Sequence, residues 1–196
     1  NPWTMKIPTW NVNGIRARHE QFAQWAASEK PDVICLQEIK AKHDQIPQTC
    51  LIEGYTCYWH GAGGYSGVAL HVRRDFAPEV AHTHPDFDME TRIVQAQIED
   101  TVFTSVYVPN GRKDYEAKLA FINSLIGYAA DIRKRGLKLV LCGDMNIARS
   151  EIDVHPKERK PRAIGQLPEE RALFERLLEE GGLVDTGRML YPDDEN

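Results

Sequence analysis

Short apolar runs, each about as long as a β-strand, alternate along the chain with longer amphipathic stretches. This alternation limits the fold more than any other feature, because strand-length and helix-length segments in turn predict an α+β protein. Pro8 falls inside the first run, where its missing N–H suits an edge strand or a bulge. The predicted strands are Ile7–Val12, Val33–Leu36, Gly67–Val72, Arg92–Ile98, Val102–Val108 and Leu137–Cys142. The predicted helices are His19–Ser28, Tyr115–Arg135 and Pro168–Glu180.

The second predicted helix has the clearest boundaries and the clearest apolar face. Asp114 suits the N-cap position, and Gly136 suits a helix end after a basic last turn. In the last helix, Pro168 suits the first turn and Gly181-Gly182 the end. The apolar residues of the second helix that recur at three- and four-residue steps are Leu119, Ile122, Leu125, Ile126, Ala129 and Ile132.

With 196 residues, the chain is long enough for one domain with a sizeable core, so we expect residues 1–196 to form a single domain. Met5 looks like a natural start, and residues 1–4 are interpreted as an upstream extension or a cloning remnant. No secretory leader is visible and no apolar run approaches the ~20 residues of a membrane helix. The four cysteines lack metal-ligand or redox spacing, which favours reduced thiols in a cytosolic protein.

The net charge of −5 excludes a generally basic nucleic-acid binder, but it does not exclude DNA. A carboxylate-rich metal site adds negative charge, while a local basic strip can still contact phosphates. One such strip lies in Ser150–Gln166, which is predicted to be a surface loop. Its cations are Lys157, Arg159, Lys160 and Arg162. Arg112, which follows a predicted strand, is a further candidate for contact with DNA.

Polar groups lie at or just beyond the ends of four predicted strands. Any one of them could belong to a turn, but four such cases with carboxylate, carboxamide or phenol groups favour a common site. The groups are Asn11, Glu38, Tyr107, and the pair Asp144 and Asn146. Because a hard cation such as Mg²⁺ takes oxygen ligands, they indicate a site that hydrolyses phosphodiesters.

Each of these groups suits a role in such a reaction. Glu38 is the first candidate for a metal ligand. Asp144 can orient or deprotonate an attacking water, and Asn146 can hydrogen-bond that water or a phosphoryl oxygen. Tyr107 can donate a hydrogen bond to the phosphate or assist as charge builds up on the leaving group.

The same segments resemble the exonuclease III class of abasic-site endonucleases, in the family's order and over nearly the whole chain. The motifs that carry the resemblance are Trp10–Ala17, Leu36–Lys40, Gly64–Leu70, Tyr107–Gly111, Gly143–Ala148, Glu151–Asp153, Leu167–Arg171 and Gly182–Asp185. The resemblance implies two packed mixed β-sheets flanked by helices, in the four-layer α/β sandwich of DNase I-like proteins. It also implies Mg²⁺-dependent cleavage of the DNA backbone 5′ to abasic sites, with 3′-exonuclease and 3′-phosphatase activity.

Carried over to this chain, the resemblance assigns Glu38 to the metal and Asn11 to the network around metal and phosphate. Asn13 lies where some members carry Asp, and we take it as a further metal candidate. Tyr107 matches the catalytic tyrosine, and Asp144 and Asn146 match the pair that positions water. Asn110 is implied to contact the phosphate. The implied cofactor is Mg²⁺, with Mn²⁺ as an alternative, and the implied partner is double-stranded DNA with abasic sites or 3′ ends. We expect a monomer in the cytoplasm, associated with the nucleoid in a prokaryote.

The family's late Asp and its Ser-Asp-His-x-Pro motif have no counterpart here, so we expect a chain that lacks the last strands of the fold. Such a chain should be poorly stable and nearly inactive in isolation, because sheet edges would be left unpaired. None of the seven histidines has the missing context. His82 and His84, near Asp86 and Asp88, are interpreted as a polar loop in preference to a metal cluster.

Two alternatives stay open at the level of sequence. One is another phosphodiesterase of the same superfamily, acting on RNA, a lipid headgroup or a protein–DNA adduct. The other, motivated by the missing histidine, is a catalytically dead DNA-binding fragment.

Overall fold

The computed structural model describes residues 5–194, and the chain divides into two compact units. Unit 1 contains the chain up to Tyr107 together with Val140–Asp144, and unit 2 contains Val108–Leu139 and the chain from Met145 onward. Among the described residues, no helix combines the length and apolar character needed to cross a membrane.

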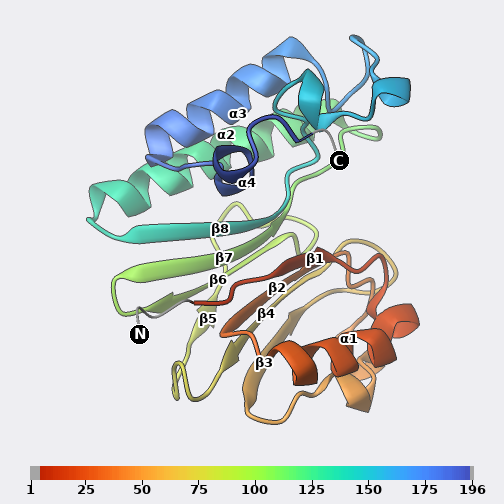
Figure 1. The fold of residues 1–196 in the computed structure, drawn as a ribbon, viewed down its shortest axis with the longest axis vertical. Coiled ribbons are helices and arrows are strands. Elements are labelled where there is room, and N and C mark those ends of the chain that lie inside the picture. Colours follow the sequence, from red (N-terminus) through yellow and green to blue (C-terminus); the bar gives the residue numbers. More distant parts are fainter. Residues whose placement is uncertain (1–4, 195–196) are drawn as a thin grey trace. The chain divides into compact units, whose positions relative to one another are not determined.

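The first sheet is four-stranded, in the order β1-β2-β4-β3 (Figure 1). β1 pairs in parallel with β2, whereas β4 runs antiparallel to both β2 and β3. The strands are β1 (Thr9–Asn11), β2 (Val33–Gln37), β3 (Tyr55–His60) and β4 (Val68–Arg73). Pro8 lies just before edge strand β1, where its carbonyl accepts the N–H of Cys35 at 3.0 Å, so its missing N–H costs the sheet nothing.

The second sheet is also four-stranded, in the order β5-β6-β7-β8. β6 pairs antiparallel with both β5 and β7. The strands are β5 (His82–Thr83), β6 (Ile93–Ile98), β7 (Thr101–Tyr107) and β8 (Lys138–Asp144).

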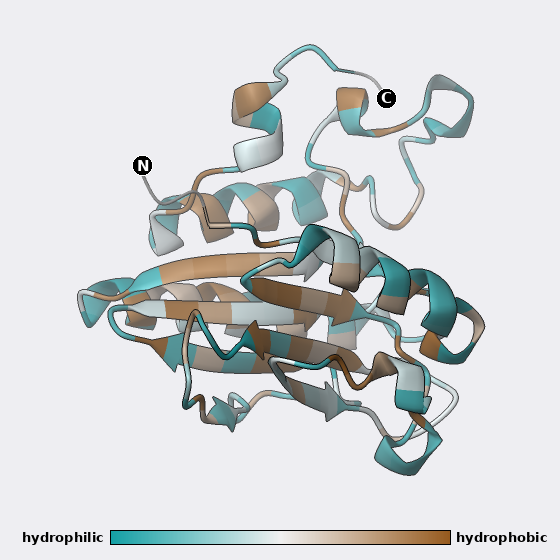
Figure 2. Ribbon diagram, turned by 60° about the horizontal axis from the view of Figure 1, so that its bottom comes forward, coloured by the Kyte–Doolittle hydropathy of each residue, from teal (hydrophilic) through white to brown (hydrophobic). Residues whose placement is uncertain are grey.

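Buried hydrophobic residues of unit 1 pack against both faces of the first sheet. On one face Phe22 and Ala26 of helix α1 (Ile15–Glu29) pack against Leu36 and other buried residues. On the opposite face Val33 and Cys35 belong to a cluster that also contains residues of β6 and β7. All of β2 is therefore buried, which explains its apolar run Val33–Leu36, while its last residue, Gln37, is polar and also buried. Figure 2 shows hydrophobic residues, in brown, concentrated in the strands.

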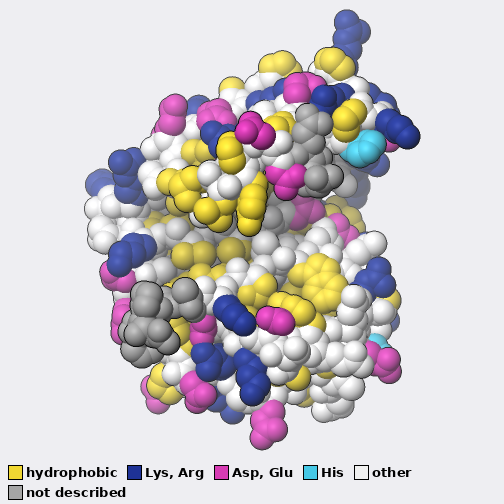
Figure 3. Space-filling view, viewed as in Figure 1, with side chains coloured by type: hydrophobic (Ala, Val, Ile, Leu, Met, Phe, Trp, Pro, Cys, Tyr) yellow, Lys and Arg dark blue, Asp and Glu magenta, His cyan; other side chains and the backbone are white. Residues whose placement is uncertain are grey.

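Unit 2 is built on helix α2 (Tyr115–Lys134), with α3 (Pro168–Gly181) packed against it. The short helix α4 (Thr186–Leu190) follows, and hydrophobic side chains gather over it in Figure 3. The exposed large apolar residues in and beside α4 are Val184, Met189, Leu190 and Tyr191. Four single 3₁₀ turns complete the described elements: η1 (His43–Gln45) and η2 (Gln48–Cys50) in unit 1, and η3 (Glu151–Asp153) and η4 (Pro156–Glu158) in unit 2.

The predicted elements are confirmed in position, and α4 and the 3₁₀ turns were not predicted; three further differences concern β3, β5 and α1. β3 was not predicted, because its Thr, Cys and His residues do not form an apolar run. The segment at His82 was interpreted as a polar loop, which is wrong for His82 and Thr83, since they pair with β6 as β5. Helix α1 begins at Ile15, four positions earlier than predicted, because Gly14 N and Ile15 N bond to the carbonyls of Glu38 and Ile39 and fix its start.

The predicted helix caps are also confirmed. The carboxylate of Asp114 accepts the N–H of Ala117 at 2.9 Å, and α3 ends on Gly182 in the left-handed conformation, with φ +62°. In α2, however, the inward position of the first turn is taken by Lys118, which is fully buried, while Leu119 is only half-buried.

Candidate active site

Four of the residues predicted to form the site belong to unit 1 and lie at strand ends. Asn11, Tyr107 and Asp144 are the last residues of β1, β7 and β8, and Glu38 directly follows β2. A residue at the end of a buried strand lies at the edge of the sheet. A polar residue that follows an apolar run is therefore expected at that edge.

Asn11 joins the two carboxylates of this cluster. Its Nδ2 donates to Glu38 Oε1 at 2.9 Å and to Asp144 Oδ2 at 2.9 Å. One amide therefore joins two carboxylates, and the bond from Asn11 to Asp144 spans 133 positions of sequence. Its Oδ1 accepts the N–H of Asn13 at 3.0 Å, which fixes the amide's orientation.

Glu38 also receives the ammonium group of Lys40, with Nζ 2.8 Å from Oε2. Lys40 Nζ donates in turn to Asn13 Oδ1 at 2.6 Å. Burial raises the pKa of Glu38, but the hydrogen bonds from Asn11, Lys40 and Tyr107 outweigh it and hold the pKa below its ordinary value. Glu38 is therefore a carboxylate at neutral pH, and a cation already occupies one of its oxygens.

Tyr107 is a protonated phenol that donates to Glu38. Burial is the main cause that raises its pKa, and the hydrogen bond to the Glu38 carboxylate raises the pKa further. The guanidinium of Arg92 lies over the Tyr107 ring, 4.8 Å from its centroid, and donates to the Tyr107 carbonyl at 3.3 Å. Arg92 also donates to the hydroxyl of Tyr65 at 2.8 Å, so a buried arginine connects the catalytic candidate to an exposed tyrosine.

The backbone of this site adopts conformations that non-glycine residues seldom take. Asn13, Glu38 and Lys40 have φ values of +44°, +53° and +49°. Left-handed residues of this kind cluster where a fold fixes a functional side chain against local preference. Gly143 is required for packing as well, because a Cβ there would lie 1.9 Å from the carbonyl oxygen of Val106.

The remaining catalytic candidate, Asn146, belongs to unit 2, two residues beyond Asp144 along the chain. It also has a left-handed backbone, with φ +50°, and its Nδ2 donates to the carbonyl of Val108 at 2.7 Å. Asn110, the phosphate-contact candidate, is exposed, and its Oδ1 accepts the N–H of Arg112 at 3.0 Å. Unit 2 thus holds both asparagines in defined backbone turns.

A buried ion pair connects these two turns within unit 2. Lys118 Nζ lies 2.5 Å from Glu170 Oε1, and both side chains have no exposed surface. The same ammonium donates to the carbonyl of Asn146 at 2.8 Å and to that of Asn110 at 3.4 Å. Glu170 Oε2 accepts the N–H groups of Gly165 and Leu167 at 2.6 and 3.0 Å. The Lys118–Glu170 pair therefore connects the two turns, at Asn110 and Asn146, to the end of the loop Ser150–Gln166.

The loop Ser150–Gln166 is mostly exposed, and its predicted DNA-contact cations differ in their exposure and in their contacts within the loop. Lys157 and Arg162 are exposed, as is Arg112. Arg159 is half-buried and donates to the carbonyl of Val154 at 3.1 Å, whereas Lys160 lies 3.4 Å from Glu158. Arg159 thus takes part in holding the loop together, which its sequence position did not indicate.

The donor set around Glu38 fits a hard cation. Glu38 and Asp144 provide carboxylate oxygens, and Asn13 provides an amide oxygen that already accepts from the Lys40 ammonium group. Asn11 holds the two carboxylates together, and all four residues belong to unit 1. Mg²⁺ binds one or two carboxylates and completes its shell with water and substrate phosphate. The ammonium group of Lys40 at Glu38 shows that a positive charge is accommodated at this place.

Sequence reasoning missed three residues that organise the site: Arg92, Lys118 and Glu170. Arg92 is only 2% exposed and Lys118 and Glu170 are fully buried, although charged residues are normally interpreted as solvated. The only available signal was the helical spacing of Lys118 relative to Phe121, Ile122 and Leu125, which places it on the apolar face.

Comparison with known proteins assigns the family. Residues 9–190 match the endonuclease/exonuclease/phosphatase family model. An exodeoxyribonuclease of Bacillus subtilis is 34% identical over 96% of the chain and 77% of its own length. The DNA repair nuclease APEX1 of Danio rerio is 38% identical over 96% of the chain and 64% of its own length. The chain belongs to the endonuclease/exonuclease/phosphatase family.

A solved structure supports the same assignment. The AP endonuclease from Archaeoglobus fulgidus matches with a TM-score of 0.86 and 29% identity, over 98% of this chain and 76% of that one. The resemblance to abasic-site endonucleases predicted from the motifs is confirmed, and so is the fold class of two sheets with flanking helices.

Proposed function

We propose that this protein hydrolyses phosphodiester bonds of double-stranded DNA with a Mg²⁺ ion, or with Mn²⁺ in its place, and that it acts in DNA repair. The observation that supports this most directly is the joining of Glu38 and Asp144 through the Asn11 amide, at 2.9 Å to each carboxylate. This arrangement brings together a metal-binding carboxylate and a second carboxylate that can act on water.

In this proposal Glu38 and Asn11 hold the metal ion, with Asn13 beside them. The bound ion would supply charge stabilisation to the phosphoryl group. Asp144 orients the attacking water and accepts its proton, and Asn146, two residues further along the chain, hydrogen-bonds the water or a phosphoryl oxygen. Tyr107, a protonated phenol in this structure, turns its O–H from Glu38 to the substrate phosphate.

The finer assignments of substrate rest on the family resemblance. We propose cleavage 5′ to abasic sites, with 3′-exonuclease and 3′-phosphatase activity, by a monomer in the cytoplasm. Phosphate contacts are assigned to Asn110, Arg112, Lys157, Lys160 and Arg162, with Arg159 supporting the loop.

The test is a Mg²⁺-dependent cleavage assay on the protein. It compares a duplex containing one abasic site with undamaged duplex, RNA and a small phosphodiester. We expect Mg²⁺-dependent cleavage of the abasic strand, and its loss on addition of a chelator. Preferential cleavage of RNA or of the small ester would overturn the proposed substrate.

The Asp144→Ala variant separates an enzyme from a binding protein. If the protein only bound DNA, its salt-sensitive DNA affinity would be measurable, and Asp144→Ala would change no Mg²⁺-dependent turnover. Asn123→Ala, on the exposed face of α2, is the matched control.

A further inference from the structure

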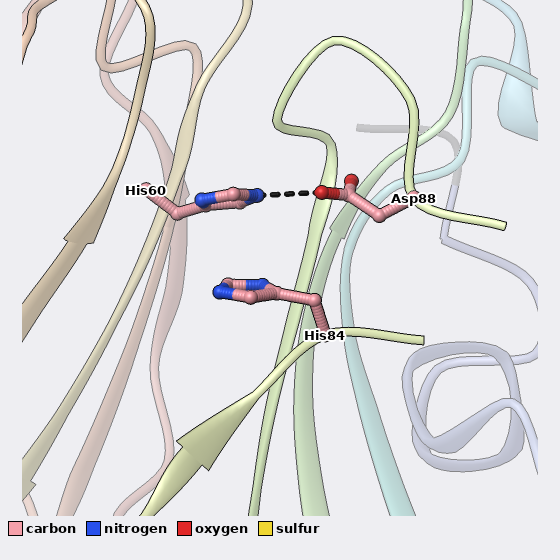
Figure 4. Close-up of side chains that lie close together, drawn as sticks. All are labelled: His60, His84 and Asp88. Carbon is pink, nitrogen blue, oxygen red and sulfur yellow. Dashed lines mark hydrogen bonds and ion pairs between the residues drawn. The ribbon is translucent and has the colours of Figure 1, made fainter. Parts of the chain in front are cut away.

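We propose that His60, His84 and Asp88 form a second cation site in unit 1, which takes a transition-metal dication of the Zn²⁺ class. His60 ends β3, His84 follows β5, and Asp88 lies between β5 and β6. One ligand atom from each of the three lies within 4.8 Å of the other two. Figure 4 shows the two imidazoles lying over one another, with Asp88 directed at His60.

The chemistry of the three donors selects the metal. Two imidazoles and one carboxylate, with a position left for water, form the ligand set of open zinc sites. Mg²⁺ prefers oxygen donors only, whereas imidazole suits Zn²⁺, Cu²⁺ and Ni²⁺. The oxygen-rich cluster at Glu38 and the nitrogen-rich cluster at His60 should therefore bind different metals.

The Asp88 carboxylate is held by hydrogen bonds in an orientation that suits a metal ligand. Asp88 Oδ1 accepts the N–H groups of Arg92 and Ile93 at 2.9 and 3.1 Å, and Oδ2 lies 2.6 Å from His60 Nε2. These contacts fix the carboxylate on the side of the imidazoles. Supporting hydrogen bonds of this kind orient the ligands of metal sites in general.

The tautomer of His84 follows from its two partners. Nδ1 lies 3.1 Å from the carbonyl of Ile93, and a carbonyl can only accept, so Nδ1 carries the proton. The lone pair is then on Nε2, where the Tyr58 hydroxyl donates to it at 2.7 Å. A neutral imidazole whose second nitrogen donates to a backbone carbonyl is the form that binds metal.

Metal entry requires small side-chain movements. Bonds of about 2.0–2.1 Å in a tetrahedral site separate ligand atoms by roughly 3.3 Å. The His60–Asp88 contact of 2.6 Å must open, and His84 must turn out of its stack on His60, where the ring centroids are 3.8 Å apart. The proton between His60 and Asp88 moves to His60 Nδ1 or to solvent, and the metal takes its place. Tyr58 releases His84 at the same time.

The experiment is a calorimetric titration of the metal-free protein with Zn²⁺ in the presence of excess Mg²⁺. We expect one saturable Zn²⁺ site that Mg²⁺ does not displace. His84→Gln and Asp88→Asn should each weaken Zn²⁺ binding at least tenfold. His43→Gln and Asp86→Asn make the same chemical changes at exposed positions and should leave the affinity unchanged.

A second measurement needs no variant. Imidazole ¹H–¹⁵N signals of His60 and His84 should shift on addition of one equivalent of Zn²⁺, while those of His43 should not. The absence of saturable binding would overturn the proposal. So would Zn²⁺ binding that is lost in Glu38→Gln or Cys57→Ser but retained in His84→Gln. Neither readout depends on nuclease activity, so failure here leaves the proposed function untouched.

Discussion

The two units stabilise charged groups in opposite ways. In unit 1, Asp144 ends β8 and Glu38 directly follows β2, and the Glu38 side chain keeps 18% of its surface exposed. The Asn11 amide donates a hydrogen bond to both carboxylates, and the Lys40 ammonium group neutralises Glu38. In unit 2, Lys118 and Glu170 have no exposed surface and neutralise each other directly. Glu38 can exchange the Lys40 ammonium group for another cation. Loss of either Lys118 or Glu170 would instead leave the other as a buried, unpaired charge.

If this comparison is correct, changing a carboxylate of unit 1 should abolish activity and leave the fold intact. We expect Asp144→Asn to lower the rate of DNA cleavage on the order of 10²–10⁴-fold, because the water loses its base. The midpoint of urea unfolding should move little, since the asparagine can still accept from Asn11. Single-turnover kinetics and urea titration measure the two effects. A large loss of stability with unchanged turnover would break the comparison.

The opposite result is expected for the ion pair of unit 2. Lys118→Met leaves Glu170 buried without its partner and should cost about 3–5 kcal/mol of unfolding free energy. The double variant Lys118→Met, Glu170→Gln should recover part of that loss, because no charge is left unpaired. Urea unfolding of both variants tests this. Equal stability of wild type and Lys118→Met would show that the pair does not hold unit 2 together.

Acid should affect unit 1 through His71. This histidine has no exposed surface, and burial is the main cause that lowers its pKa to about 3. The unfolded chain binds the proton near pH 6.5 and the folded chain only near pH 3. The stabilisation is therefore lost as the pH falls through that window, by on the order of 2–4 kcal/mol. Unfolding free energies from pH 7 to pH 4 measure it.

The control for this pH effect is a matched pair of variants. His71→Gln keeps an acceptor for the N–H of Tyr58, which bonds to His71 Nδ1 at 3.1 Å, but it cannot take up a proton. Its stability should depend less on pH than that of the wild type. His43→Gln, at an exposed position, should retain the wild-type slope.

The smallest effects are expected at the exposed cations of unit 2. Lys157→Ala and Arg162→Ala should each weaken DNA binding uniformly across sequences and reduce the slope of log affinity against log salt by about 0.9. Lys30→Ala, an exposed change in unit 1, provides the control. Affinity measured at several salt concentrations distinguishes the two outcomes, and an unchanged slope for both loop variants would remove this loop from the DNA contact.

The strands and helices were largely predictable because they depend on local signals. β2 contains the apolar run Val33–Leu36, β7 is rich in β-branched and aromatic residues, and α2 begins at a capping aspartate. β3 and β5 were missed, since Tyr55–His60 and His82–Thr83 gain their strand conformation from pairing with β4 and β6. Tyr55–His60 has strand-favouring aromatic residues but no aliphatic run, and His82–Thr83 is only two residues long, so the pairing with a neighbouring strand defines both.

The sequence by itself determined which chemical groups the site contains. Asn11, Glu38, Tyr107 and Asp144 each stand at the end of an apolar run, and that position can be read locally. Only the tertiary structure decided how they connect: one amide of Asn11 joins two carboxylates, and Arg92 lies on Tyr107. It also placed His60 beside His84 and Asp88, and buried Lys118 with Glu170. These contacts join residues far apart in the chain, and a buried charge has no local signature because its partner comes from another segment.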